Sequence, residues 1–273
     1  MSRFSGWTGR TLLALICVSA PVLAQVAPPL GVAQTFGALG NSGVTGSTGI
    51  GTVVNGDVGS SPSPAISNFP PSTAAFPFTV HLANDATVQL AHLDAIAAYD
   101  FLAAQGPGTV LADQLDGAVL TSGIYSFASG AADLAATGTL TLNGPGVFVF
   151  QVGSGLTAND DSNIIGTADP CNVYWRVGSS ATLNGLTFRG NVIADASVTL
   201  GPGANMTGKA LGGIGATGAV TMAGPGGNTI GGCTALPTGP PITEIPTLGL
   251  AGLVLLILVL AAVVLLKMGR RTT

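Results

Sequence analysis

Charge is the scarcest property of this sequence. Only 7% of its 273 residues are charged, whereas soluble domains carry about 25%. Lys and Arg together number eight, too few to line a groove that contacts many nucleic-acid phosphates. We therefore expect no nucleic-acid partner. The hydrophobic fraction of 47% also excludes a disordered charged tail, because such tails lack the apolar surface that drives folding.

Ionisable groups that could perform catalysis are scarce for the same reason. His81 and His92 are the only histidines, and eleven residues of helix would separate them by about 16 Å. That distance is too long for one metal ion, so surface or helix-capping roles are expected. Asp160-Asp161 with Asn163 predicts a polar turn rather than a Ca²⁺ loop. We expect no metal site, no cofactor and no enzyme of the lyase or hydrolase type, which needs paired carboxylates.

The first 24 residues are typical of a secretory signal peptide. Arg3 and Arg10 give a basic start, a short apolar core follows, and Val22-Leu23-Ala24 is a small-residue cleavage site. The mature chain is therefore expected to begin at Gln25 and to be secreted across the inner membrane.

The last residues, 247–273, are typical of a membrane segment. Leu248 to Leu266 is a run of 19 residues without a charge, and Lys267, Arg270 and Arg271 follow it. About 20 apolar residues span a bilayer, and basic residues mark the cytoplasmic side. A buried core helix is the weaker alternative. A Pro-rich linker is expected over 234–246.

The same end of the chain contains a short motif, Glu244-Ile245-Pro246-Thr247-Leu248. Together with the apolar span and the basic cluster it resembles bacterial C-terminal sorting signals of the IPTL type, which are PEP-CTERM-like. That resemblance implies a sorting protease as a partner. The protein is then either anchored at the cell surface or released after processing.

The remaining domain, 25–233, begins with Gly-, Ser- and Thr-rich strands and contains one predicted α-helix over about 84–105. Asn84 or Asp85 can cap the helix, and Gly106-Pro107-Gly108 ends it. Apolar residues recur at spacings of three and four, which predicts the buried face of an amphipathic helix. The residues of that face are Leu82, Ala86, Leu90, Leu93, Ala97 and Phe101.

After Leu111 the sequence predicts short β-strands to the end of the domain. Units of the form x-Thr-apolar end at Leu183, Leu200 and Met222, and a repeat of about 20 residues indicates a solenoid. Turns every 8–12 residues also fit an antiparallel sandwich, so the pattern alone leaves both open. The single long helix favours the solenoid, because it fits along the flank of a β-helix.

Several segments of the domain occur in a characteristic order. The longest is Cys171-Asn172-Val173-Tyr174-Trp175-Arg176-Val177-Gly178-Ser179-Ser180-Ala181-Thr182-Leu183, and others are Val54-Asn55-Gly56-Asp57-Val58-Gly59, Gly190-Asn191-Val192-Ile193-Ala194 and Gly208-Lys209-Ala210-Leu211. Over roughly Leu30 to Ile230, these segments resemble the ice-binding β-solenoid domain of bacteria, fungi and algae, and the longest is the most specific. The resemblance implies an all-β solenoid, a right-handed β-helix of triangular cross-section, with one long α-helix packed alongside.

By the same resemblance, the partner is an ice surface and the function is antifreeze activity, inhibition of ice recrystallisation, or adhesion to ice. A face that binds ordered water should be flat, uncharged and rich in Thr, Ser and Ala. The candidate residues are Thr139, Thr141, Thr182, Thr199 and Thr221, with Thr45 and Thr48 from the segment Thr45-Gly46-Ser47-Thr48. No Thr-x-Thr pair repeats on every turn of the chain.

The mature domain contains a candidate disulfide, and its fold also allows a second function. Cys171 and Cys233 are the two cysteines of the mature domain, and in an oxidising compartment they form either one disulfide or two separate thiols. The alternative function is a non-catalytic adhesin or structural envelope protein that uses the same fold on a glycan or a neighbouring cell. In either case the domain is expected to be a monomer.

Overall fold

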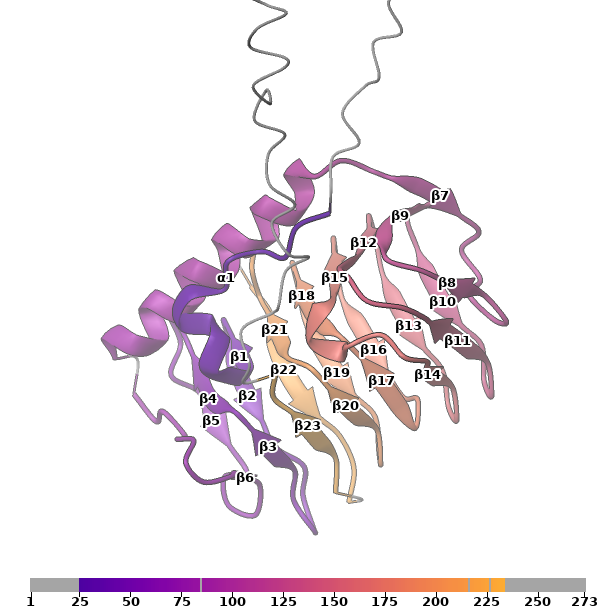
Figure 1. Ribbon diagram of the computed structural model, residues 1–273. Coiled ribbons are helices and arrows are strands. Elements are labelled where there is room, and N and C mark those ends of the chain that lie inside the picture. Colours follow the sequence, from indigo (N-terminus) through magenta and orange to yellow (C-terminus); the bar gives the residue numbers. More distant parts are fainter. Residues whose placement is uncertain (1–24, 84, 216, 226, 234–273) are drawn as a thin grey trace, which may run out of the picture.

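The fold is a parallel β-solenoid with three sheets around one core (Figure 1). The computed structural model describes residues 25–83, 85–215, 217–225 and 227–233. Every strand pair among them is parallel. The predicted solenoid is therefore confirmed, and the antiparallel sandwich is wrong.

Each turn of the coil contributes one short strand to each sheet, except that the turn containing β7 and β8 has no strand in sheet B. Sheet A contains, in spatial order, β4 (Asp57–Ser60), β1 (Phe36–Gly40), β21 (Ala210–Gly212), β18 (Asn191–Ala194), β15 (Val173–Val177), β12 (Phe148–Val152), β9 (Gly123–Phe127) and β7 (Thr109–Leu111). Sheet B contains β10 (Ala132–Leu134), β13 (Leu156–Ala158), β16 (Ala181–Leu183), β19 (Val198–Leu200), β22 (Ala219–Met222), β2 (Gly43–Thr45) and β5 (Ile66–Ser67). Sheet C contains β6 (Thr73–Ala74), β3 (Val53–Asn55), β23 (Thr229–Gly231), β20 (Asn205–Thr207), β17 (Thr187–Arg189), β14 (Asn163–Ile165), β11 (Thr139–Leu142) and β8 (Val119–Leu120).

The order of the turns differs from the order of the chain. The two N-terminal turns, β1–β3 and β4–β6, stack on the C-terminal turn β21–β23. The helix α1 (Ala86–Ala104) then carries the chain back along sheet A to β7, at the opposite end (Figure 1). Its 19 residues span about 28 Å, which is close to the height of about 34 Å expected for a stack of eight strands.

The helix packs on the outer surface of sheet A through small side chains. Val88, Ala91, Ala95, Ala98 and Leu102 are fully buried there. They form a second apolar cluster with outward residues of sheet A such as Val149, Tyr174 and Ile193. The three alanines bring the helix backbone close to the sheet, and larger buried side chains such as Leu102 pack beside them.

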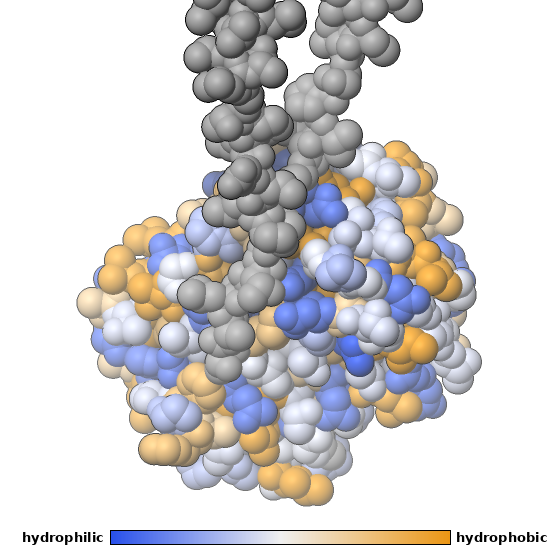
Figure 2. Space-filling view, viewed as in Figure 1, coloured by the Kyte–Doolittle hydropathy of each residue, from blue (hydrophilic) through white to orange (hydrophobic). Residues whose placement is uncertain are grey.

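The predicted buried face of this helix is wrong. Leu82, Leu90, Leu93 and Phe101 are exposed by 67%, 51%, 59% and 37%, and Figure 2 shows apolar residues gathered over α1. The helix is apolar on two sides, so the spacing of three and four residues fits either one. The sheet packs against the side that carries Ala91, Ala95 and Ala98.

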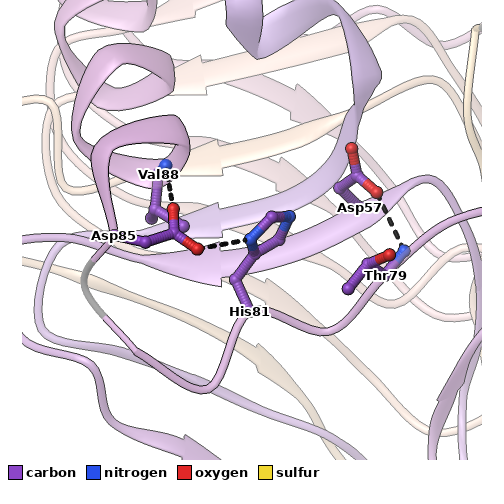
Figure 3. A network of polar contacts seen from close by, with 5 residues as sticks. All are labelled: Asp57, Thr79, His81, Asp85 and Val88. Carbon is purple, nitrogen blue, oxygen red and sulfur yellow. Dashed lines mark hydrogen bonds and ion pairs between the residues drawn. The ribbon is translucent and has the colours of Figure 1, made fainter.

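The start of α1 is fixed by a capping carboxylate (Figure 3). Asp85 is the N-cap, and its Oδ1 accepts a hydrogen bond of 3.0 Å from the Val88 N–H. Its Oδ2 lies 3.0 Å from His81 Nδ1, and this hydrogen bond holds the pKa of Asp85 below its usual value. His81 also stacks on Phe36. Nearby, Asp57 Oδ1 accepts a hydrogen bond from the Thr79 N–H.

The second histidine is neither on the surface nor at a cap. His92 is 8% exposed, because it lies on the side of α1 that meets the sheet. Its Nε2 is 3.4 Å from Asn41 Nδ2, and burial lowers its pKa. The expected surface or capping role is therefore wrong for His92, whereas His81 contacts the helix cap through its hydrogen bond to Asp85.

Inside the coil, aromatic rings from successive turns stack on one another. The ring centroids of Phe150 and Trp175 are 3.9 Å apart, and Tyr125 and Phe188 extend the stack on either side. The Trp175 Nε1–H donates a 3.0 Å hydrogen bond to the Arg189 carbonyl. Gly190 follows with φ of +120°, and a Cβ there would lie 2.8 Å from Trp175 Nε1. Only glycine fits this close approach.

A disulfide holds the C-terminal end of the solenoid, and a buried lysine joins its C-terminal turn to its N-terminal turn. Cys171, in the 3₁₀ turn η2 (Pro170–Asn172), is joined by a disulfide to Cys233, and their Cα atoms are 5.3 Å apart. Lys209 is 1% exposed. Its Nζ donates hydrogen bonds to the carbonyls of Gln34 and Phe36. Gln34 lies in the 3₁₀ turn η1 (Gly31–Thr35), and Phe36 is the first residue of β1.

The burial of Lys209 predicts a pH dependence of stability. Burial lowers the pKa of its ammonium group from 10.5 to about 8, and the Asp57 carboxylate partly opposes this. Above pH 8 the unfolded chain keeps a proton that the folded chain releases, so the free energy of unfolding rises. We expect this group to contribute a rise of about 2 kcal/mol between pH 7 and 9.5. Urea unfolding of the wild type and of Lys209→Met measures it. An equal pH dependence in both proteins would contradict the assignment.

The expected signal peptide, 1–24, and the expected sorting segment, 247–273, lie outside the described residues. Within the part of the chain that the structure describes, no helix is long and apolar enough to cross a membrane. The apolar run Leu248–Leu266 does not belong to that part.

Candidate functional site

Three outer surfaces are available on a three-sided solenoid, and α1 covers the one formed by sheet A. The outer surfaces of sheets B and C carry all of the candidate threonines except Thr48. The strands of sheet B bury their flanking residues and direct the central residue outward, as in Leu156–Ala158, Ala181–Leu183 and Val198–Leu200. This alternation follows from the two-residue period of a strand.

The outward residues of sheet B form one continuous column. In register from one end to the other, they are Asp133, Thr157, Thr182, Thr199, Thr221, Thr45 and Ser67. Five successive turns of the coil therefore place a threonine at the same position. Adjacent strands lie about 4.8 Å apart, so the column is a regular row of methyl and hydroxyl groups.

Small neutral residues precede the threonines of this column. The positions two residues before the five threonines are Gly155, Ser180, Ser197, Ala219 and Gly43. The only charged member of the column is Asp133, at one end, where its Oδ1 accepts a 3.1 Å hydrogen bond from Asn159 Nδ2. The middle of the face is uncharged.

The threonine hydroxyls at the centre of the column are free to bind water. Among the described residues, no hydrogen bond from protein satisfies the side chains of Thr157, Thr182, Thr199 or Thr221, and each is half-buried. Thr45 differs, because its Oγ1 accepts a 3.1 Å hydrogen bond from Ser67 Oγ. β-branching restricts χ1, so the free hydroxyls are held in a fixed pattern.

Two serines at the corner between sheets A and B hold the turns in register. Ser180 Oγ accepts a 3.3 Å hydrogen bond from the Ser197 N–H, and Ser197 Oγ accepts a 3.1 Å hydrogen bond from the Ala219 N–H. Each hydroxyl thus extends the backbone ladder by one bond towards the next turn. The spacing of Thr182, Thr199 and Thr221 depends on these neighbours.

We expect Ser180→Ala and Ser197→Ala each to lower the free energy of unfolding by about 1 kcal/mol, because each leaves a backbone N–H without its partner. Chemical unfolding measures this loss. Ser179→Ala is the matched control, since Ser179 is exposed at the same corner, and we expect a change within about 0.5 kcal/mol. Equal effects at all three positions would contradict the role of the two hydroxyls.

Sheet C carries Thr139 and Thr141, which the sequence analysis grouped with the threonines of sheet B. The column through Thr139 alternates threonine and asparagine, with Asn163, Thr187, Asn205 and Thr229 as its next members. Several of these side chains already have protein partners. Thr229 Oγ1 donates to Asn205 Oδ1, and the Asn163 amide donates to the Asp161 carbonyl.

The rest of sheet C is also less uniform than sheet B. Thr141 is in register with Val119 and Ile165, which are 65% and 44% exposed. Arg189 places a charged residue on the same sheet. The structure therefore separates Thr139 and Thr141 from the column of Thr45, Thr182, Thr199 and Thr221.

Thr48 belongs to neither column. It is exposed in the loop that follows β2, and the neighbouring Ser47 turns inward, where its Oγ lies 2.9 Å from Thr52 Oγ1. Of the segment Thr45-Gly46-Ser47-Thr48, only Thr45 lies on the surface of sheet B.

Thr157 and the alignment of the threonines in one column were not predicted from the sequence. Leu156-Thr157-Ala158 has the same apolar-Thr-apolar form as the units around Thr182 and Thr199, so a search for that form alone would have found it. No Thr-x-Thr pair repeats along sheet B, because three-residue strands such as Leu156–Ala158 have only one outward position, at their centre. One threonine on each of five turns is enough to make a row.

These features define a class of protein: a parallel β-solenoid with one helix-covered side and one flat, neutral, threonine-bearing side. Within the described residues, no group of three or more His, Cys, Asp or Glu side chains is placed to hold a metal ion. A family model described as "Ice-binding-like" matches residues 38–227. The chain belongs to this ice-binding family.

Individual relatives agree with the family assignment. An ice-binding protein of Nostoc sp. (strain HG1) is 41% identical over 201 residues, which is 71% of each chain. The crystal structure of an ice-binding protein from the Antarctic ascomycete Antarctomyces psychrotrophicus is similar, with a TM-score of 0.65 and 36% identity, and the match covers 74% of this chain and 97% of the other. A second crystal structure, of an ice-binding protein from an Antarctic biological consortium, has a TM-score of 0.66 and 32% identity. That match covers 78% of this chain and 94% of the other.

Proposed function

We propose that this protein adsorbs to ice through the outer surface of sheet B. The observation that carries the proposal is the row of Thr157, Thr182, Thr199, Thr221 and Thr45 on successive turns. Membership of the ice-binding family supports it, as do the relatives that carry the same description.

The threonine row can hold water in an ordered arrangement before the protein meets ice. Each threonine methyl restricts the water beside it, and each hydroxyl joins that water through hydrogen bonds. Because χ1 is fixed and the strand spacing is regular, the ordered water costs little further entropy when it merges with a crystal. A charged group would impose its own hydration shell, and the central turns of this face carry none.

We also propose a non-catalytic role, a right-handed coil, and export from the cytoplasm. The coil direction rests on the family resemblance and on the strong preference of parallel crossovers for that hand. Export and membrane anchoring, with C-terminal sorting, rest on the basic-apolar start and on Leu248–Leu266 with its basic cluster. Mass spectrometry of the exported protein tests both ends, by identifying Gln25 as the first residue and by showing whether residues 247–273 are retained.

The ice function is tested with purified residues 25–240. Thermal hysteresis, inhibition of ice recrystallisation, and partition of the protein into a slowly growing ice crystal are the measurements. We expect all three to be positive. A folded protein that fails all three at high concentration would favour the adhesin function instead.

A further inference from the structure

The N-terminal segment and the end of α1 form an apolar groove that the described residues leave open. The groove has a volume of about 490 Å³ and is lined mainly by Val26, Pro28, Pro29, Leu30 and Phe101. It lies on the helix-covered side of the molecule, away from the threonine column on sheet B. Phe101 remains 37% exposed at its edge.

The walls of this groove are held in place by hydrogen bonds. Gln105, the C-cap of α1, pairs with the backbone of Val26 at both its N–H and its carbonyl, at 3.0 and 2.7 Å. Asp94 on the same helix accepts a 2.6 Å hydrogen bond from the Val32 N–H. The segment from Val26 to Leu30 is therefore fixed against the helix, and the groove is formed in advance of any ligand.

The described chain ends beside this groove. Gln34, which also lines it, donates a 2.8 Å hydrogen bond from Nε2 to the Cys233 carbonyl. Cys233 is in turn fixed by its disulfide to Cys171. The residues that follow therefore start from a fixed point at the groove, and their effective local concentration there is high.

The composition of the following residues matches the groove. Residues 234–246 contain four prolines, and Leu236-Pro237 and Pro240-Pro241-Ile242 are apolar and proline-rich. Leu236 is three residues from Cys233, about 10 Å of extended chain. Proline-rich segments bind grooves lined by aromatic and proline side chains, because their extended conformation is already restricted.

We propose that the segment 234–246 docks in the groove between Val26–Leu30 and Phe101, and so ties the C-terminal tail to the helix-covered side. The tail then leaves the domain on the side opposite the open faces. With the membrane anchoring proposed above, on which this consequence rests, the threonine face of sheet B is directed away from the membrane.

The test is hydrogen–deuterium exchange of the exported full chain in detergent micelles. We expect backbone amides of 234–246 to exchange at least about tenfold more slowly than an unstructured chain. Phe101→Asp should remove this protection, because a charge replaces the aromatic wall. Leu90→Asp is the matched control, since Leu90 is 51% exposed on the same helix and does not line the groove, and it should retain the protection.

A tail variant tests the groove from the other side. Replacing Leu236 and Pro237 by Gly and Ser should speed exchange at Val26, Ala27 and Leu30, while the melting temperature of the domain stays unchanged. Three results would overturn the proposal: exchange of 234–246 at the unstructured rate, protection that rises with protein concentration and so indicates a second copy, or protection equal in the Phe101→Asp and Leu90→Asp variants. Ice adsorption is measured separately on the same proteins, so failure of the ice function leaves this result intact.

Discussion

Thr199→Tyr is expected to lower thermal hysteresis activity by about tenfold or more. Thr199 is the middle member of the five threonines, in register with Thr182 on one side and Thr221 on the other. A tyrosine ring would stand above the plane of the methyl groups. An ice surface could then not contact the neighbouring turns at the same time, so the loss should exceed that of one side chain.

The matched control is Thr139→Tyr, which places the same ring on sheet C. Both threonines are half-buried on a β-strand and were candidates from the sequence. We expect Thr139→Tyr to retain ice activity and both variants to unfold at the wild-type temperature. Loss of activity only in the sheet C variant would move the ice-binding surface from sheet B to sheet C.

Trp175→Ala is expected to lower the free energy of unfolding by about 3–5 kcal/mol. The indole is completely buried, stacks on Phe150 at 3.9 Å, and satisfies the Arg189 carbonyl. Its removal leaves a cavity in the centre of the coil and an unpaired backbone acceptor. Urea unfolding followed by circular dichroism measures the loss.

Two controls separate packing from other causes. Leu186→Ala changes a side chain that is 48% exposed, and we expect a loss within about 0.5 kcal/mol. Trp175→Phe keeps a ring in the stack and loses the N–H donor. Its loss of unfolding free energy should therefore lie between those of Trp175→Ala and Leu186→Ala. A Trp175→Ala protein as stable as the Leu186→Ala protein would show that the aromatic stack does not support the fold.

The sequence predicted the elements of this fold better than their neighbours in space. Short alternating strands and one long helix follow from local patterns, and α1 begins and ends within two residues of the expected 84–105. Which threonines share a column depends on loop lengths, and these vary: Thr182 and Thr199 are 17 residues apart, whereas Thr199 and Thr221 are 22 apart. The two-residue period of a strand predicts that a threonine points outward, but it does not predict which of the three sheets contains that strand.

The position of Thr45 shows a second limit. It lies next to Thr221, although 176 residues separate them, because α1 returns the chain from one end of the coil to the other. No local pattern encodes that return. The buried face of α1 was mispredicted for a related reason, since the larger residues Leu90 and Leu93 were expected to be buried and the sheet instead accepts the alanines.

The most direct test of the ice-binding surface is adsorption of fluorescently labelled protein to a single ice crystal. We expect the wild-type domain and Thr139→Tyr to coat the same crystal planes and Thr199→Tyr to leave them bare. A wild-type protein that does not coat the crystal, or a Thr199→Tyr protein that coats it as well as the wild type, would contradict adsorption through sheet B.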